Sequence, residues 1–171
     1  KTPINQLPLF NGAYIIKLNQ IKKYLDNFKP NNKNNNLGGL FKIKHKNHFL
    51  LIDIDKPPQK EFSKSYQSGP LSFEYFLDGI KIITNSGFGS QISKKTELLS
   101  RLTACQSSLT INDTSITKFE KNEMINRVYG NSIQDSFKSF GYSSKNENGQ
   151  IGCSASNNGY EKKFGCTHKR E

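Results

Sequence analysis

The chain has 171 residues, with 25 Lys and Arg against 14 Asp and Glu, which gives a formal net charge of +11 at pH 7. No stretch approaches the roughly 20 consecutive apolar residues that a helix needs to cross a bilayer, so membrane insertion through a helix is excluded. The N-terminus has neither a Met nor the apolar core of a signal peptide, and we therefore expect a segment of a longer protein.

The positive charge suggests an anionic partner. Only three of the 25 basic residues are Arg (Arg101, Arg127 and Arg170), and the rest are Lys. A compositional bias towards Lys, Asn and Ile would produce the same charge without any ligand. Because bidentate recognition of phosphates and bases favours Arg, a nucleic-acid partner is not expected.

Three cysteines cannot all pair within one chain, so a disulfide framework is not expected. They are Cys105, Cys153 and Cys166, and they form no Cys-x-x-Cys pair and no zinc-finger spacing with His. A Cys153–Cys166 bridge stays open for an oxidising compartment, whereas buried free thiols are the favoured interpretation.

The first predicted element is an amphipathic helix over residues 13–28. Its apolar residues recur at spacings of four and three, with polar residues between them, which is the helical period. Pro30 ends the pattern, and the Asn-rich residues 31–36 form a polar linker before Gly38-Gly39. The chain therefore divides into residues 1–36 and residues 37–171.

After this boundary the period changes to two. Residues 41–44 and 49–54 predict two strands joined by a turn at Lys46-Asn47. Asp78-Gly79 between residues 71–77 and 80–85 predicts a two-residue hairpin turn. The expected cross-strand pairs are Leu77–Ile80, Phe76–Lys81, Tyr75–Ile82 and Phe73–Thr84.

The remaining segments are predicted from shorter patterns. We expect a helix over residues 93–103 with Leu98, Leu99 and Leu102 inward, and a strand over residues 107–112. Residues 121–149 predict irregular or edge structure, and residues 151–155 and 163–168 predict strands. Successive short strands with turn signals indicate a mainly β fold, an antiparallel β-sandwich preceded by a short amphipathic helix.

Few residues suggest chemistry on their own. Asp53 and Asp55 lie on the same side of a predicted strand, and a solvated strand end is favoured over paired catalytic carboxylates. Lys42, Lys44 and Lys46 alternate along one strand face and are candidates for binding a polyanion. A solvated outer face is the competing interpretation of these lysines.

Six short motifs follow one another in a specific order. They are LPLFNG at residues 7–12, Asp55 with Pro57-Pro58, SGPLSFE at 68–74, NSG at 85–87, SSLTINDT at 107–114 and GYxxxFGxxHxR at 159–170. Taken together with their separations, these motifs resemble the heparinase II/III-like polysaccharide lyase family over nearly the whole chain.

The resemblance implies a fold and an activity. Family members join an N-terminal helical toroid to a C-terminal antiparallel β-sandwich, so residues 1–36 would end the toroid and residues 37–171 would begin the sandwich. The whole protein would cleave a uronate-containing acidic polysaccharide, similar to heparan sulfate or alginate, by β-elimination in the periplasm or cell envelope. The family's catalytic Tyr and its Asn or His partner lie on the toroid, so no catalytic residue is expected in this chain. The alternative is a non-catalytic polyanion- or carbohydrate-binding β module.

The resemblance also implies a structural divalent metal held by His, Asp and His. The corresponding positions are occupied by Gln67, Asn85 and Gln106. Because three neutral amides make a poor zinc site, we expect no metal cofactor and favour a hydrogen-bonded amide cluster. His168 matches a retained family position, and we expect it to be a strand residue with satisfied hydrogen bonds.

Overall fold

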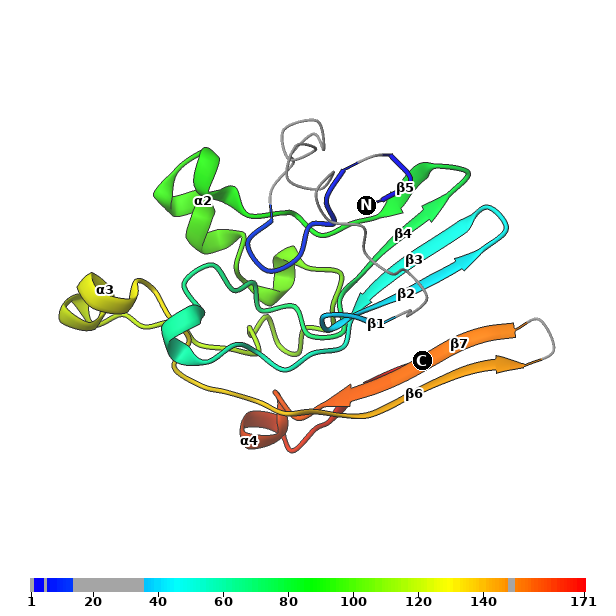
Figure 1. The fold of residues 1–171 in the computed structure, drawn as a ribbon. Helices are drawn as coiled ribbons and strands as arrows, with labels where there is room; N and C mark the ends of the chain where they lie inside the picture. Colours follow the sequence, from blue (N-terminus) through cyan, green and yellow to red (C-terminus); the bar gives the residue numbers. More distant parts are fainter. Residues whose placement is uncertain (1, 5, 14–35, 148–149) are drawn as a thin grey trace.

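Two antiparallel β-sheets organise the part of the chain that the computed structural model describes, which is residues 2–4, 6–13, 36–147 and 150–171 (Figure 1). The predicted antiparallel β-sandwich is therefore confirmed, whereas residues 14–28 of the predicted amphipathic helix lie outside the described residues. The first sheet has the strand order β1 (Asn36–Leu37), β2 (Leu40–His45), β3 (His48–Asp53), β4 (Phe73–Leu77) and β5 (Ile80–Ile83). The second has the order β6 (Ser139–Glu147), β7 (Gln150–Asn157) and β8 (His168–Arg170).

Short helices connect these strands. No helix in the described part of the chain is long and apolar enough to span a membrane. The short helices in the described part of the chain are η2 (Lys60–Phe62), η3 (Gly89–Gln91), α2 (Lys94–Leu99), η4 (Thr103–Cys105), α3 (Glu123–Tyr129) and α4 (Glu161–Phe164).

The two predicted hairpins are present, with one difference in register. The β2–β3 hairpin turns at Lys46-Asn47, and β4–β5 turns at Asp78-Gly79 with the expected Leu77–Ile80 pair. Beyond it Tyr75 pairs with Ile83 and not with the predicted Ile82, because the register shifts by a bulge. β5 is an edge strand, where an extra residue disrupts only one ladder.

Two hydrophobic clusters form the core of the described part of the chain. In the first sheet Phe49, Leu51 and Phe76 pack with Phe10 of the N-terminal segment. The second cluster gathers Tyr66, Ile116, Ile133, Phe137 and Tyr160. Each cluster combines residues far apart in sequence, so the loops between the sheets are as much a part of the core as the strands.

The two sheets meet at an aromatic contact. Figure 1 shows β6 and β7 running along the side of the first sheet that is formed by β1 and β2. Phe41 of β2 contacts Tyr142 of β6 edge to face, with ring centroids 5.6 Å apart. An aromatic pair in this geometry stabilises beyond its buried area.

Several predicted elements are wrong, and the reasons are local. Residues 107–112 form no strand, because Ser107 and Ser108 bond through their side chains to Phe73 and Pro70 instead of joining a ladder. Residues 121–149 contain β6, an edge strand as expected, and also α3, which was not predicted because its side chains are mostly exposed and show no periodic apolar pattern. Residues 163–168 do not form the predicted strand, because α4 extends to Phe164 and β8 begins only at His168.

The predicted helix over residues 93–103 is shorter than expected. Ser93 caps α2 by accepting a hydrogen bond from the Thr96 amide, and the helix ends at Leu99. Leu99 is 47% exposed and does not point inward, whereas Arg101 just beyond the helix is fully buried. All three cysteines are free, as favoured, but Cys105 and Cys153 are only half-buried and Cys166 is exposed, so the expectation that the thiols are buried is wrong.

Candidate functional site

The three amide residues at the family's metal positions lie buried, and two of them share a backbone partner. Gln67 and Gln106 both donate through Nε2 to the carbonyl oxygen of Ser100, at 3.2 and 2.7 Å. Asn85 accepts hydrogen bonds from the backbone amide and the hydroxyl of Ser107, at 2.9 and 3.1 Å. We call Gln67, Asn85 and Gln106 the amide cluster, and it joins the loops before β4, after β5 and after η4.

The donor set of the amide cluster does not fit a zinc ion. The side-chain oxygens of Gln67 and Asn85 already accept hydrogen bonds, and both Gln amide nitrogens are engaged at Ser100. Zinc sites use imidazole, thiolate or carboxylate ligands, and the described residues contain no group of three His, Cys, Asp or Glu that could hold a metal. These hydrogen bonds suit neutral amides, although the side-chain nitrogen of Asn85 is buried without a partner among the described residues.

Gln67 also fixes the N-terminal segment. Its Oε1 accepts a hydrogen bond from the Gly12 amide at 3.1 Å, so one side chain ties the turn at residues 10–13 to the loop after α2. Gly12 has φ +91°, and a Cβ there would lie 2.8 Å from Cβ of Ser65. Only glycine allows this close approach.

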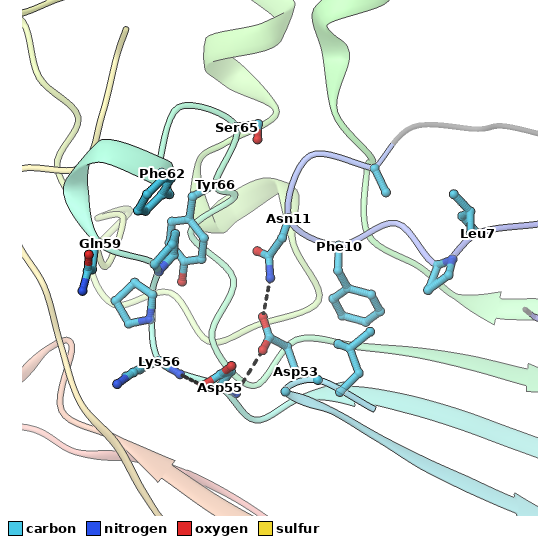
Figure 2. A pocket seen from close by; sticks show the side chains of 17 residues that line it. Leu7, Phe10, Asn11, Asp53, Asp55, Lys56, Gln59, Phe62, Ser65 and Tyr66 are labelled. Carbon is cyan, nitrogen blue, oxygen red and sulfur yellow. Dashed lines mark hydrogen bonds between the residues drawn. The ribbon is translucent and has the colours of Figure 1, made fainter. Parts of the chain in front are cut away.

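A pocket of about 610 Å³ lies beside that turn, and we call it the Asp53 pocket. Asn11, next to Gly12, points its amide at the Asp53 carboxyl group at the end of β3, 3.5 Å away (Figure 2). Asp55 and Tyr66 contribute polar groups to the lining. Phe62 adds an aromatic ring, and the adjacent Pro57-Pro58 adds two apolar rings.

The carboxyl group of Asp53 is buried, with 4% of the residue exposed, so the predicted solvated strand end is wrong for this residue. Burial is the main cause that raises the pKa of Asp53 to about 7, and the hydrogen bond from the Asp55 amide only partly opposes it. Asp55 itself is exposed. The continuous apolar run from Phe49 to Ile52 is the sequence signal that could have predicted the burial of Asp53.

Tyr66 forms the opposite wall of the Asp53 pocket. The residue is 4% exposed, and its hydroxyl has no hydrogen-bond partner among the described residues. Figure 2 shows the hydroxyl at the end of the ring that faces the side of Asp53 and Asp55. Burial, followed by the two carboxylates, raises the pKa of Tyr66 well above its usual value, so the hydroxyl is a neutral donor and acceptor.

A buried arginine positions the loop that carries Tyr66. Arg101 donates to the carbonyl oxygens of Tyr66 and Ser63, at 2.8 and 2.9 Å, and its guanidinium lies 4.1 Å from the ring centroid of Phe119. Burial lowers the pKa of Arg101 to about 10, which leaves the side chain charged at neutral pH. Nothing in the sequence pattern indicates this role.

The predicted lysine candidates are only partly brought together. Lys42 and Lys44 pair with Leu51 and Phe49, which places them on the sheet face that carries the first core cluster and not on an outer face. Lys44 and Lys46 are exposed and line a depression of about 450 Å³, whereas Lys42 is half-buried and does not line it. Polyanion binding by the three lysines stays a prediction.

His168 is a buried strand residue. Its Nδ1 lies 3.3 Å from Nδ2 of Asn157 on the paired strand β7. Burial, followed by the charge of Arg170, lowers the pKa of His168 to about 4, so the ring is neutral at physiological pH. This geometry agrees with the expected structural role.

A family model described as Heparinase II/III-like, C-terminal, matches residues 29–171. The chain therefore belongs to this family, as the motifs indicated, and it is related to polysaccharide lyases. A search of curated protein sequences finds no match.

Solved structures of heparinases share the fold. The structure described as "Heparinase III-BT4657 gene product" matches 99% of this chain with a TM-score of 0.63 and 13% identity. A heparan sulfate lyase HepC mutant from Pedobacter heparinus matches 92% of it with a TM-score of 0.60 and 15% identity. This chain spans 27% and 26% of the lengths of those two chains, about a quarter of each.

Proposed function

We propose that this chain is the β-sandwich part of a lyase that cleaves a uronate-containing acidic polysaccharide by β-elimination, in the periplasm or cell envelope. The observation that carries the proposal is the family match over residues 29–171, since the fold alone does not define an activity. The boundary between a toroid end at residues 1–36 and the sandwich at residues 37–171 is part of the same proposal.

In β-elimination a base removes the proton α to the uronate carboxyl group while an acid protonates the leaving glycosidic oxygen. We assign neither role to a residue of this chain. The sandwich supplies the wall of the substrate cleft, and Lys42, Lys44 and Lys46 attract the acidic polymer. The net charge of +11 favours such a partner electrostatically.

The amide cluster replaces the family's metal site in this proposal. The hydrogen bonds of its side chains join the three loops that a coordinated metal ion would otherwise join. Dialysis of the complete protein against a chelator should leave its thermal unfolding midpoint unchanged, and added Zn²⁺ should not raise it. A metal-dependent midpoint would contradict this part of the proposal.

A second candidate is a non-catalytic carbohydrate- or polyanion-binding module. The observation that favours it is the amide cluster itself, because the three positions carry none of the family's acidic or imidazole side chains. The same loss is compatible with an active enzyme if the metal has only a structural role.

One experiment separates the two candidates. The complete protein is incubated with heparan sulfate, alginate and other uronate polymers, and the ultraviolet absorbance of the unsaturated uronate product is followed. A rise in absorbance on one of these polymers supports the lyase. Binding without any product supports the non-catalytic module and contradicts the lyase.

A further inference from the structure

The Asp53 pocket carries chemistry that the elimination reaction does not use. We propose that it is a subsite for an uncharged, hydroxyl-bearing sugar residue of the polysaccharide. This inference rests on the proposed function, because the ligand is a residue of the same polymer. It assigns Tyr66, Asp53 and Phe62 to substrate binding, which no sequence motif indicates.

The polar groups in the pocket match sugar hydroxyls. A sugar hydroxyl both donates and accepts, and the pocket offers the Asp53 carboxyl group and the Tyr66 hydroxyl within one cavity. The ring of Tyr66 is held in a buried position, and its hydroxyl, which has no hydrogen-bond partner among the described residues, is available to a ligand in the pocket. A ligand hydroxyl in the pocket would supply that partner.

The apolar part of the lining matches the C–H face of a sugar ring. Phe62 is 76% exposed, which is unusual for a ring of this size, and Pro57 and Pro58 continue the apolar surface beside it. Ligand sites combine such apolar walls with a few convergent polar groups. Packing a sugar ring against Phe62 would remove this exposed apolar area from water.

The charges favour an uncharged residue over a sulfated or carboxylated one. An anionic substituent would either face the Asp53 carboxylate or force that group to stay protonated, and both alternatives weaken binding. Asp55 is exposed at the rim and accepts a hydrogen bond from the Lys56 backbone amide, whereas Asp53 is buried, so the discrimination comes chiefly from Asp53. Burial favours the neutral form of Asp53, which can donate as well as accept.

Binding of an uncharged N-acetylglucosamine trimer to the complete protein tests the subsite by calorimetry. Tyr66→Phe removes only the hydroxyl, and we expect it to weaken binding about five- to tenfold, the loss typical of one hydrogen bond. Tyr129→Phe is the matched control, because Tyr129 lies at the end of α3 and outside the pocket. Phe62→Ala should weaken binding to a similar extent, and Phe140→Ala on β6 should not.

A second probe tests the discrimination. The 6-O-sulfated form of the trimer should bind more weakly than the uncharged trimer, and Asp53→Asn should reduce this difference. Equal affinities for the wild type, Tyr66→Phe and Phe62→Ala would overturn the proposal, as would tighter binding of the sulfated trimer. Phe62 is on the surface, so its replacement keeps the test valid if Tyr66→Phe folds poorly.

Failure of the subsite differs from failure of the proposed function. If the wild type releases no unsaturated product from any uronate polymer, the lyase is contradicted while trimer binding is still measurable. If product forms but Tyr66→Phe and Phe62→Ala leave both KM and trimer binding unchanged, only the subsite is contradicted.

Discussion

Asp53 shows how one buried carboxyl group makes stability depend on pH. It ends a strand whose preceding residues are apolar, and the turn carrying Asn11 covers it, so the group lies in a poorly solvated place. Its pKa is about 7 in the folded chain, whereas an unfolded Asp has its ordinary value of 3.8. The folded state therefore holds a proton that the unfolded state has released between these two values.

The first prediction follows from this difference. Stability should fall as the pH rises from about 4 to about 7 and then level off, because the carboxylate must form in a buried place. Asp53→Asn keeps the size of the side chain and removes its ionisation, so at pH 8 it should be more stable than the wild type by up to about 4 kcal/mol. Denaturant unfolding at several pH values measures this.

Asp135→Asn is the matched control, because Asp135 is exposed. It should reproduce the pH dependence of the wild type. If Asp53→Asn also kept the full decrease between pH 4 and pH 7, the decrease would come from other groups and the role of Asp53 would be refuted.

At the scale of elements, Gln67 and Gln106 differ in what they hold in place, although both belong to the amide cluster. Both bond to the Ser100 carbonyl, but only Gln67 also accepts from the Gly12 amide. Gln67→Leu should therefore release the N-terminal turn, whereas Gln106→Leu should leave it in place. Each variant should cost about 1–3 kcal/mol of stability, since buried partners lose a hydrogen bond.

Amide hydrogen exchange distinguishes the two variants. Gly12 should lose protection in Gln67→Leu and keep it in Gln106→Leu, even if both variants unfold at similar denaturant concentrations. Similar protection of Gly12 in both would show that Gln67 does not hold the turn. Because that turn also carries Asn11, the same bond helps to build the Asp53 pocket.

The lysines of β2 give the prediction on polymer binding. Replacing Lys42, Lys44 and Lys46 together by Gln should weaken binding of heparan sulfate and flatten its dependence on salt, because fewer counterions are displaced. A matched triple variant replaces three exposed lysines elsewhere and removes the same charge. Equal effects of the two triples would show that only net charge matters. The control lysines are Lys94, Lys95 and Lys121.

The sequence predicted those elements whose period or turn chemistry is strong. The β2–β3 hairpin and the Asp78-Gly79 turn are examples, because two-residue periodicity and a turn dipeptide act locally. The side chains of α3, which was missed, are mostly exposed and therefore lack a periodic apolar pattern. The family pattern drew attention to Gln67, Asn85 and Gln106, but the link from Gln67 to Gly12 depends on a contact across 55 residues, which no local pattern indicates.

The Asp53 pocket was also missed because it depends on contacts between residues that are distant in the sequence. Asn11, Asp53 and Tyr66 come from three separate segments, and only packing brings them together. Burial of Tyr66 in turn depends on Arg101, which fixes the loop from Ser63 to Tyr66 through its two backbone carbonyls. No local pattern encodes an arginine that bonds to a loop 35 residues away.

At the scale of the whole molecule, the last strand of the second sheet adds contacts to the first sheet beyond the Phe41–Tyr142 pair. Arg170 of β8 donates to the carbonyl oxygens of Leu71 and Ser107, the latter at 2.8 Å. Its guanidinium also lies 4.8 Å from the ring centroid of Phe73 on β4. One side chain therefore connects β8 with the strand and loop that adjoin the amide cluster.

Arg170→Ala should consequently loosen the whole sandwich and not only its own strand. Charge-assisted hydrogen bonds contribute about 1.5–3 kcal/mol each, and removing both donors leaves two partly buried carbonyls without them, so we expect a loss of about 3 kcal/mol. Lys169→Ala is the matched control, because Lys169 is exposed and its ion pair with the exposed Glu171 contributes little. Denaturant unfolding measures both. Equal small losses would show that the C-terminal strand is not what holds the two sheets together.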